Sequence, residues 1–560
     1  MPLSEPSAPE AALSARPVLR RAARALGAAV LGLAAVLAGG GPAHADFGSD
    51  YHDPISAGQP LTRPDTRSCV VEVMHERAFK DGYGSPADTP YNGSLTPPAD
   101  CAGPWSKVVL DLHGSVAGRQ FDRLFTVRVG GVEVLMSSTP EPSRDGIEWR
   151  VERDVTRYAP VLTDTQPFEL DLANVTDGTY TGVFVISATF TFYTASASWP
   201  AARTADQVLT GGGFTLDQGH PGSSREFTFP RNLERLTAEV YARGGGACEE
   251  FAYASAPEEF VQANPGRGYC GQGPFRELRL AVDGRVAGAV WPYPVIYTGG
   301  WDPLLWRPTP GIFAFDLPAY QVDLTPYVGL LLDGRPHAVS LTVNAAERQS
   351  NDAWTGQLNL FATVDHGSTR TSGALTQHQV APEAAVRTEL TDLGGGSGDW
   401  TVTAARHDLA KGWVQTSHGR VSTEVRSDRT FRSDQQLRDG GGDLTLHNRT
   451  DQTSTSTRRG GGPPSTGIVQ ESAPLDVRYR YTADAAGSTD QRTEMVLGHH
   501  RTATDDGRRS TVDHTYAPSA HRHDGDATVR TGSSVETYRS TGPDGPYART
   551  ITTRDGWPVP

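Results

Sequence analysis

The acidic side chain best placed for chemistry in this sequence is Asp122, in the segment Gln120-Phe121-Asp122-Arg123. Its aromatic and aliphatic neighbours indicate partial removal from water, which raises the pKa of a carboxyl group, whereas the charge of Arg123 opposes this shift. A carboxylate of this kind could serve as a general base. The alternative is that Asp122 pairs with an arginine at a strand end, and the local pattern alone favours this alternative because structural ion pairs also perturb pKa values.

Other familiar hydrolytic motifs are missing from the sequence. It contains no Gly-x-Ser-x-Gly elbow and no His-Glu-x-x-His metal helix. The sixteen histidines form no cluster with the spacing of a catalytic metal site, and several lie in the polar C-terminal region. We therefore expect no metal and no other cofactor, which leaves carboxylates as candidate catalytic groups.

A second group of candidates could bind sugar, because aromatic rings stack on pyranose rings while planar polar groups bind hydroxyls. Trp301, Asp302, Trp306 and Arg307 lie together in a loop bounded by glycines and a proline. The alternative for one of the two tryptophans is burial in the core at the base of the loop. Arg123 is a further candidate for binding substrate, and Glu141, in the segment SSTPEP, is a weaker candidate for the same site.

The four cysteines each border a stretch that is rich in loop residues. Cys69 and Cys101 flank one such stretch, and Cys248 and Cys270 flank another, so pairing in sequence order would close two loops. Four cysteines allow three connectivities, and the sequence alone excludes none of them. A zinc site is disfavoured because no pair has Cys-x-x-Cys spacing.

The elements that must position these residues are β-strands. Alternation of apolar and polar residues, β-branched types and turn signals recur throughout residues 68–195, and Gly130-Gly131 marks a hairpin. Residues 206–345 repeat the pattern. We predict an all-β fold with two β-sandwich or jelly-roll domains in tandem, at 46–205 and 206–365, followed by a polar, β-rich C-terminal domain at 366–560.

Export from the cell is predicted by the N-terminus. Residues 1–45 combine four arginines, the apolar run 25–38 and the small residues Ala43-His44-Ala45, as in a cleaved signal peptide. The apolar run is short for a membrane span, and Arg20-Arg21 leaves twin-arginine export as an alternative route. We expect a secreted monomer that is free of the membrane after cleavage. The net charge of −14 disfavours nucleic acid as a partner.

Several motifs resemble the amidase A family of peptide-N-glycanases, secreted enzymes that remove N-linked glycans from asparagine. They are QFDR, SSTPEP, GIEW and DVTRY within residues 118–158, and a longer block over residues 273–333. The resemblance spans roughly residues 65–345. The Phe-Asp-Arg context and Cys248-Glu249-Glu250-Phe251 also resemble, more distantly, the shorter bacterial enzyme PNGase F.

This resemblance implies two jelly rolls side by side with a shared cleft, and Asp122 and Glu250 as catalytic residues facing each other across it. Glu239 and Glu277 remain alternatives for the second acid, because about twenty residues are inserted after Glu250. Asn174 stands where the bacterial enzyme has a third glutamate, so a third catalytic carboxylate is not expected.

The implied function is hydrolysis of the amide bond between asparagine and the first N-acetylglucosamine, with N-glycosylated peptides or glycoproteins as substrates. A non-catalytic glycan-binding protein and a glycoside hydrolase with two carboxylates are the alternatives. Because the candidate acids and the tryptophan loop precede Asp365, we expect the two sandwiches alone to retain some hydrolysis.

Overall fold

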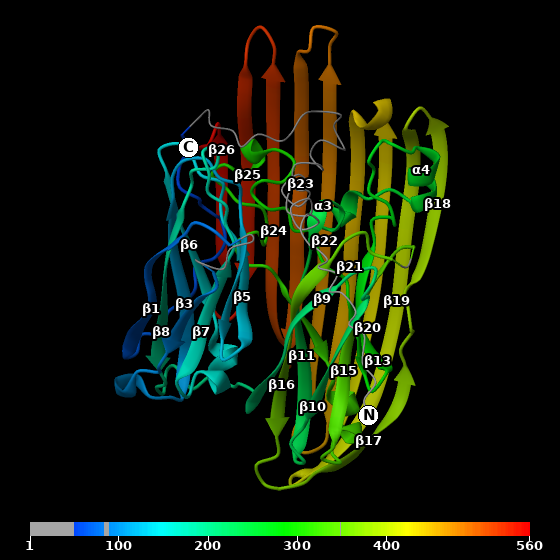
Figure 1. Cartoon of the computed structure of the whole chain (residues 1–560). Coiled ribbons are helices and arrows are strands. Elements are labelled where there is room, and N and C mark those ends of the chain that lie inside the picture. Colours follow the sequence, from blue (N-terminus) through cyan, green and yellow to red (C-terminus); the bar gives the residue numbers. More distant parts are fainter. Residues whose placement is uncertain (1–49, 83–88, 348) are drawn as a thin grey trace, which may run out of the picture.

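The structure is a computed structural model that describes residues 50–82, 89–347 and 349–560. The predicted signal peptide, residues 1–45, lies outside the described residues. The rest is built from antiparallel strands joined by loops and short helices, so the predicted all-β fold is confirmed. Two sandwiches lie side by side, and one long sheet extends behind both (Figure 1).

The first sandwich packs two four-stranded sheets, with the strand orders β1-β8-β3-β6 and β2-β7-β4-β5. Every second residue of strand β8 points inward, from Phe184 to Phe190, as expected for a strand with one buried face. The predicted hairpin joins β4 and β5, and Gly130 and Gly131 both adopt positive φ angles there. The strands are β1 (Ser68–Phe79), β2 (Tyr91–Leu95), β3 (Trp105–Val116), β4 (Leu124–Val129), β5 (Val132–Ser138), β6 (Ile147–Asp154), β7 (Gln166–Leu172) and β8 (Phe184–Thr194).

The second sandwich repeats this plan, with the strand orders β10-β15-β12-β13 and β14-β11-β16-β9. Its core is formed by aliphatic residues from both sheets, such as Leu236, Leu280 and Leu341. Two short helices, α3 (Gly246–Glu249) and α4 (Glu258–Ala263), occupy the connection after β11. The strands are β9 (Gln207–Leu216), β10 (Gly222–Thr228), β11 (Leu233–Gly244), β12 (Arg276–Val282), β13 (Arg285–Val290), β14 (Ala319–Asp323), β15 (Pro336–Ala345) and β16 (Trp354–Val364).

The remaining residues form a single eleven-stranded sheet, called here the C-terminal sheet. From β19 to β27 each strand pairs with the next one in sequence. Strands β17 and β18 both pair with β19 at one edge of the sheet. The strands are β17 (Ser372–Gln379), β18 (Ala385–Gly394), β19 (Ser397–Thr416), β20 (Gly419–Arg438), β21 (Asp443–Arg459), β22 (Ser465–Ala483), β23 (Thr489–Asp505), β24 (Arg508–Asp524), β25 (Val529–Thr541), β26 (Tyr547–Arg554) and β27 (Trp557–Val559).

One face of the C-terminal sheet is buried by the second sandwich, and its buried residues are partly apolar and partly polar. Trp400, Phe431, Leu475 and Tyr516 share one hydrophobic cluster with the loops at residues 251–313. In the long strands β19 and β20 mainly alternate residues are buried, which explains why the sequence of this region contains few large apolar residues. The sheet therefore obtains its core from contact with the loops that follow β11 and β13.

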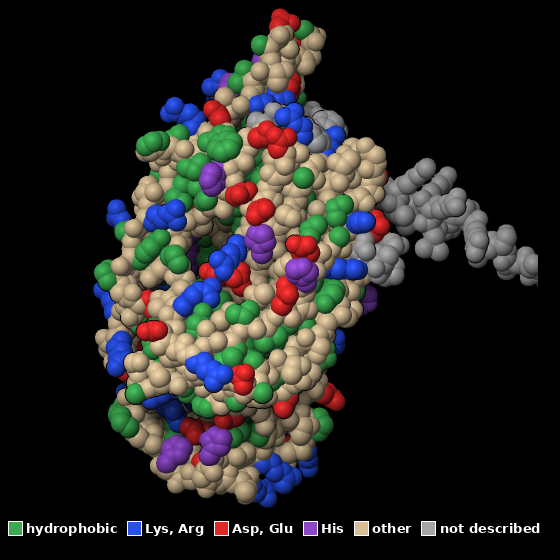
Figure 2. All heavy atoms as spheres, turned by 90° about the vertical axis from the view of Figure 1, so that its left-hand side faces the viewer, with side chains coloured by type: hydrophobic (Ala, Val, Ile, Leu, Met, Phe, Trp, Pro, Cys, Tyr) green, Lys and Arg blue, Asp and Glu red, His purple; other side chains and the backbone are tan. Residues whose placement is uncertain are grey.

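The N-terminal segment ties the first sandwich to the far end of the C-terminal sheet. Ser56 Oγ donates to Glu536 Oε1 at 3.0 Å, the Ala57 N–H donates to Glu536 Oε2 at 2.6 Å, and the His52 N–H donates to Gly556 O at 2.9 Å. On the face drawn in Figure 2, acidic and basic side chains are interspersed. Within the described residues, no helix is both long and apolar enough to cross a bilayer.

Candidate active site

The two sandwiches meet through buried polar contacts that fix their relative orientation. Tyr158 of the first sandwich donates its hydroxyl to Glu239 Oε1 at 2.7 Å, and Gln357 of strand β16 donates to Gly131 O at 2.7 Å. Close by, the Thr298 hydroxyl donates to Thr139 O at 2.9 Å. This last bond brings the loop before Trp301 against the segment that carries Asp122 and Glu141.

Asp122 lies two residues before the start of strand β4 and is half-buried. Burial raises the pKa of its carboxyl group, while a hydrogen bond with the Gly299 backbone and the charge of Arg123 act in the opposite direction. Arg123 is itself held by Gln120 Oε1 at 2.6 Å and Asn174 Oδ1 at 3.2 Å. Asp122 is therefore partly shielded from water, as its sequence context indicated, and Arg123 is oriented by amides.

Glu141 lies next to Asp122, at the end of the SSTPEP loop. Its side chain is buried, and burial together with the neighbouring charge of Asp122 raises its pKa to about 8. Arg307 lies 3.8 Å away and opposes this shift. A Cβ atom at Gly299 would lie 2.5 Å from Asp122 Oδ1 and 2.9 Å from Glu141 Oε1, so the glycine lets both carboxyl groups approach the loop.

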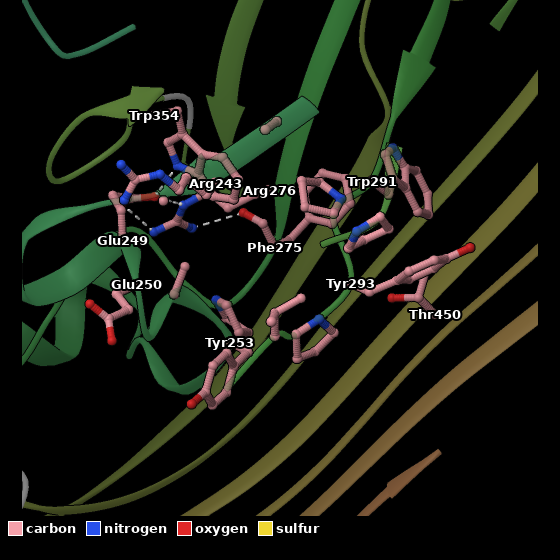
Figure 3. A pocket seen from close by; sticks show the side chains of 18 of the residues that line it. Arg243, Glu249, Glu250, Tyr253, Phe275, Arg276, Trp291, Tyr293, Trp354 and Thr450 are labelled. Carbon is pink, nitrogen blue, oxygen red and sulfur yellow. Dashed lines mark hydrogen bonds and ion pairs between the residues drawn. The ribbon is translucent and has the colours of Figure 1, made fainter. Parts of the chain in front are cut away.

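The second sandwich contributes Glu250, which directly follows α3. Its neighbour Glu249 is bound by Arg276 at 2.5 and 2.8 Å and by Trp354 Nε1 at 2.5 Å, and Glu250 points away from this cluster (Figure 3). Burial, then the charge of Asp122, raise the pKa of Glu250 to about 8, and Arg243 opposes them. Glu250 therefore belongs electrostatically to the group that contains Asp122.

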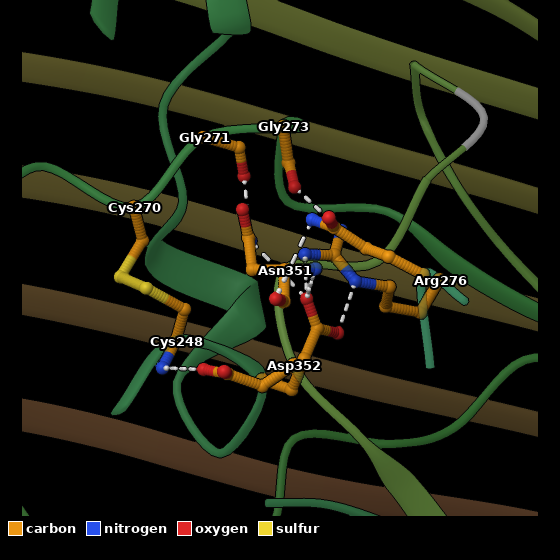
Figure 4. Close-up of a disulfide and its surroundings, with 9 residues drawn as sticks. Cys248, Cys270, Gly271, Gly273, Arg276, Asn351 and Asp352 are labelled. Carbon is orange, nitrogen blue, oxygen red and sulfur yellow. Dashed lines mark hydrogen bonds and ion pairs between the residues drawn. A yellow bond between two sulfur atoms is a disulfide. The ribbon is translucent and has the colours of Figure 1, made fainter. Parts of the chain in front are cut away.

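Two disulfides join the cysteines in sequence order, which is one of the three connectivities that the sequence left open. Cys69 is bonded to Cys101 and Cys248 to Cys270. The second disulfide fixes the loop that carries Glu249 and Glu250, and Asp352 accepts a hydrogen bond from the Cys248 N–H at 3.1 Å (Figure 4). The loop is therefore anchored on both sides of the candidate acid.

The two alternative acids, Glu239 and Glu277, both have structural partners. Glu239 accepts hydrogen bonds from Tyr158 and Asn359 and pairs with Arg157 at 2.9 Å. Glu277 accepts from Trp291 Nε1 at 2.9 Å and pairs with Arg406 at 3.2 Å. Both carboxylates are fully occupied in packing the sandwiches, which favours Glu250 as the second acid.

Asp122, Glu141 and Glu250 thus form one group of three carboxyls, called here the acid cluster. Because like charges in a shielded site disfavour one another, the three groups titrate as a coupled set. Asp122 has backbone and arginine support for its charged form, whereas burial and the charge of Asp122 raise the pKa values of Glu141 and Glu250 to about 8. Such a cluster offers one base and two acids in the same place.

The tryptophan loop mainly serves the packing between the second sandwich and the C-terminal sheet. Trp306 is only 3% exposed, packs on Tyr516 and donates from Nε1 to Gly300 O at 2.7 Å, which matches the alternative of a core residue. Asp302 is buried and pairs with Arg522 at 3.1 Å. Trp301 is half-buried and donates to the Tyr253 hydroxyl at 2.9 Å, and Arg307 stacks over the ring of Tyr51.

A pocket extends from Glu250 to the C-terminal sheet and encloses about 690 Å³ of space including its open mouth. Its walls are aromatic and proline side chains from residues 291–297 and 317–320, together with Tyr253. Phe431, Asn448 and Thr450 of strands β20 and β21 complete the lining. In Figure 3 Glu250 and Thr450 lie at opposite ends of this lining.

Sequence reasoning missed three parts of this site. Glu141 was expected to bind substrate and not to belong with the acids, Gly299 was not singled out, and the C-terminal sheet was expected to lie outside the site. No local signal identified Phe431, Asn448 or Thr450, because their pattern is that of any half-buried strand. Among the described residues, no group of three His, Cys, Asp or Glu side chains could hold a metal ion.

Comparison with known proteins agrees with the motif-based resemblance. The family model for peptide N-acetyl-beta-D-glucosaminyl asparaginase amidase A matches residues 59–381, more than half of the chain. A protein of Prunus dulcis, named peptide-N4-(N-acetyl-beta-glucosaminyl)asparagine amidase A, is 35% identical over 388 residues. That alignment covers 65% of this chain, which spans 66% of the length of the Prunus protein.

Solved structures of similar title resemble the chain distantly. A crystal structure of a peptide-N(4)-(N-acetyl-beta-D-glucosaminyl) asparagine amidase has a TM-score of 0.36 and 13% identity, covering 53% of this chain and 96% of that one. PNGF-II has a TM-score of 0.37 and 12% identity, covering 54% of this chain and 66% of that one. On the strength of the family match over residues 59–381, the chain belongs to the peptide N-acetyl-beta-D-glucosaminyl asparaginase amidase A family.

Proposed function

We propose that the protein hydrolyses the amide bond that joins an asparagine side chain to the first N-acetylglucosamine of an N-linked glycan. The observation that carries this proposal is the acid cluster, in which two sandwiches bring Asp122, Glu141 and Glu250 together beside an aromatic pocket. The activity named for the Prunus protein supports the same reaction. The substrates are N-glycosylated peptides or glycoproteins outside the cell, and the two disulfides fit that compartment.

Amide hydrolysis requires a base for water, stabilisation of the oxyanion and a proton for the leaving nitrogen. In the proposed mechanism Asp122 removes a proton from a water molecule, and the water oxygen attacks the amide carbon. Glu141, protonated at neutral pH, donates a hydrogen bond to the developing oxyanion. Glu250 lines the pocket on the sugar side and transfers its proton to the nitrogen, which leaves with the sugar. The products are an aspartate and a glycosylamine, which loses ammonia in water.

Mass spectrometry of a glycopeptide treated in ¹⁸O-water tests this function. The amidase converts asparagine to aspartate and incorporates one labelled oxygen into the peptide. A glycoside hydrolase would leave one N-acetylglucosamine on an unchanged asparagine, and a glycan-binding protein would leave the glycopeptide intact. Either of these two results would refute the proposal, and the Asp122→Asn protein serves as the control for contaminating activity.

A further inference from the structure

The N-terminal segment, residues 50–59, lies where the three parts of the molecule meet. On the first sandwich, Asp53 Oδ1 accepts a hydrogen bond from the Glu148 N–H at 2.8 Å. On the second sandwich, the Ile55 N–H donates to Pro308 O at 3.2 Å. These contacts add to the bonds with the C-terminal sheet given above, so the segment is fastened to all three parts. Only its last residue falls within the family match, which begins at residue 59.

Tyr51 of this segment contacts Glu141 of the acid cluster. The Tyr51 hydroxyl donates to the main-chain oxygen of Glu141, and the residue is only 6% exposed. The guanidinium carbon of Arg307 lies 4.9 Å from the centre of the Tyr51 ring, and Arg307 faces the Glu141 carboxyl at 3.8 Å. Tyr51 therefore contacts both the main chain of this acid and the arginine that opposes its carboxyl.

The turn between β26 and β27, at the other end of the chain, packs against Tyr51. A Cβ atom at Gly556 would lie 2.4 Å from Tyr51 Cβ, and Gly556 has a φ of +84°, so this close approach requires glycine. The His52 ring also packs edge-on against Trp557, with ring centroids 6.0 Å apart. The two ends of the described chain thus meet at the residue that contacts Glu141, and they fix its position.

Tyr51 acts on Glu141 through position and shielding and not through charge. Burial is the main reason that the pKa of Glu141 is raised, and burial also raises the pKa of Tyr51, which stays neutral. Tyr51 and Pro54 line one small pocket together with Glu141 and Arg307, so the N-terminal segment helps to keep water from the carboxyl. The charged groups that face this carboxyl come from other elements and are Asp122, Asp302, Arg307 and Arg522.

We propose that Tyr51 is a positioning residue for amide hydrolysis, and that the N-terminal segment holds Glu141 where its carboxyl donates to the developing oxyanion. This inference rests on the proposed function, in which Glu141 is the oxyanion donor. Tyr51 acts only through Glu141, because its hydroxyl fixes the main chain of the acid and its ring shields the carboxyl. A residue outside the family match thus sets the geometry of the reaction.

Steady-state kinetics of glycopeptide release by the full-length protein test the hydroxyl. Tyr51→Phe keeps the ring but removes the hydrogen bond to Glu141, so kcat should fall by roughly three- to tenfold with KM unchanged. Tyr547→Phe is the matched control, because the Tyr547 hydroxyl donates to Gly58 O at 3.5 Å, at the other end of the same segment. This control should keep the wild-type kcat and KM.

A double-mutant cycle tests whether Tyr51 acts through Glu141. Glu141→Leu removes the carboxyl at similar volume, so adding Tyr51→Phe to it should lower single-turnover release no further. In the Glu250→Gln background, Tyr51→Phe should still lower release by roughly three- to tenfold, because Glu141 is then intact. An equal loss in both backgrounds would show that Tyr51 only supports the fold.

Tyr51→Leu tests the shielding by the ring without any substrate. The smaller side chain admits water beside Glu141, so the folded pKa of this carboxyl should fall from about 8 toward its ordinary value of 4.5. A raised folded pKa lowers stability as pH rises from about 4.5 to about 8, and Tyr51→Leu reduces this loss. Thermal melts should therefore show a larger penalty for Tyr51→Leu near pH 4.5 than at pH 8.

The two proposals fail in different ways. If Tyr51→Phe keeps the wild-type kcat, or if Tyr51→Leu is destabilised equally at both pH values, Tyr51 does not position Glu141 as proposed, even when the wild type releases glycans. If Tyr51→Leu does not fold, Tyr51→Phe and the double-mutant cycle decide. Absence of glycan release by the wild type would refute the proposed function instead, whereas the melts still test the contact between Tyr51 and Glu141.

Discussion

Two adjacent glutamates show how the surroundings of a residue decide its role. Glu249 and Glu250 have the same side chain, yet their pKa values shift in opposite directions. Burial opposes ionisation of Glu249, but the charge and hydrogen bonds of Arg276 outweigh it and lower the pKa. No hydrogen-bond donor lowers the pKa of Glu250. Burial and the charge of Asp122 therefore raise this pKa to about 8, although Arg243 opposes them. One acid therefore fixes the loop while the other remains available for proton transfer.

The first prediction concerns Asp122 as the base. Asp122→Asn preserves the shape and much of the hydrogen bonding but removes the group that accepts a proton from water. Turnover should fall by a factor on the order of 10² to 10⁴ while glycopeptide binding persists. Single-turnover release of a fluorescent glycopeptide measures the first effect, and a titration measures the second. A variant that melts normally and keeps wild-type turnover would show that Asp122 is only a partner for an arginine.

The second prediction separates Glu250 from Glu249. The folded pKa of Glu250 is above its ordinary value, so the unfolded chain loses this proton first and stability falls as pH rises from about 4.5 to about 8. Glu250→Gln removes this penalty, so its melting temperature should exceed that of the wild type at pH 8 and match it near pH 4.5. Its turnover should fall because the amide has no proton to transfer.

Glu249→Gln is the matched control for this prediction. It removes the negative charge that pairs with Arg276, whose side chain is only 3% exposed. The buried arginine then lacks its ionic partner, so the melting temperature at neutral pH should fall. Thermal melts of the wild type, Glu250→Gln and Glu249→Gln near pH 4.5 and at pH 8 test this prediction. Equal destabilisation by both substitutions would contradict the division of roles between the two glutamates.

At the scale of elements, the pocket wall is fastened to the C-terminal sheet by Glu471 of strand β22. Burial alone would raise the pKa of Glu471, but hydrogen bonds and charge from His499, Tyr293 and Gln452 lower it to about 2. These bonds connect the loop after β13 to three strands of the sheet. The position of the aromatic wall therefore depends on an ionised carboxylate.

The third prediction is that this contact makes stability depend on pH at acidic values. Because the folded pKa lies below the ordinary value of 4.5, the stabilisation is fully present above about pH 5 and is lost as pH falls toward 2. A shift of this size corresponds to a free energy of unfolding on the order of 3 kcal/mol. Glu471→Gln should lower the melting temperature at pH 7 and flatten the decline below pH 5.

Glu494→Gln, an exposed substitution on the next strand, is the control and should follow the wild type at every pH. Calorimetric melts between pH 3 and pH 7 provide the measurement. If Glu471→Gln and the wild type lose stability in parallel over this range, the carboxylate does not hold the pocket wall as described.

At the scale of the whole molecule, the C-terminal sheet and the two sandwiches form a single packed unit. Figure 1 shows the sheet extending behind both sandwiches, and the hydrophobic cluster around Trp291, Trp306 and Phe431 crosses from one part to the other. The N-terminal segment joins the first sandwich to the C-terminal sheet through hydrogen bonds from Ser56 and Ala57 to Glu536. The sequence suggested that residues to Asp365 could work alone, but the packing argues against it.

The fourth prediction therefore reverses that expectation. A chain that ends at Asp365 would expose the apolar surface of residues 251–313 and lose part of the pocket lining. It should be recovered mostly as aggregate, because a large exposed apolar surface promotes association. Size-exclusion chromatography and glycan release by the truncated chain test this. A soluble monomer with wild-type turnover would show that the C-terminal sheet contributes neither to the fold nor to the site.

The sequence by itself determined the fold class and the positions of many of the strands, and it pointed to Asp122 of the proposed site. Strand periodicity and the glycine hairpin are local signals, so the all-β fold and the β4–β5 hairpin could be predicted. The flanks of Asp122 correctly indicated burial, and the loop-bordering positions of Cys69, Cys101, Cys248 and Cys270 suggested the pairing that the structure confirms. Resemblance then pointed to Glu250, which no local pattern distinguishes from Glu249.

Only the tertiary structure decided which charged and aromatic residues are occupied by partners. Glu239, Glu277 and Trp306 are chemically suited to a site, yet each is bound by residues far away in sequence. Glu141 joins Asp122 because Gly299, more than 150 residues later, leaves room for both carboxyls. Such contacts depend on long-range packing between sheets, and packing has no period or spacing that a sequence pattern can display.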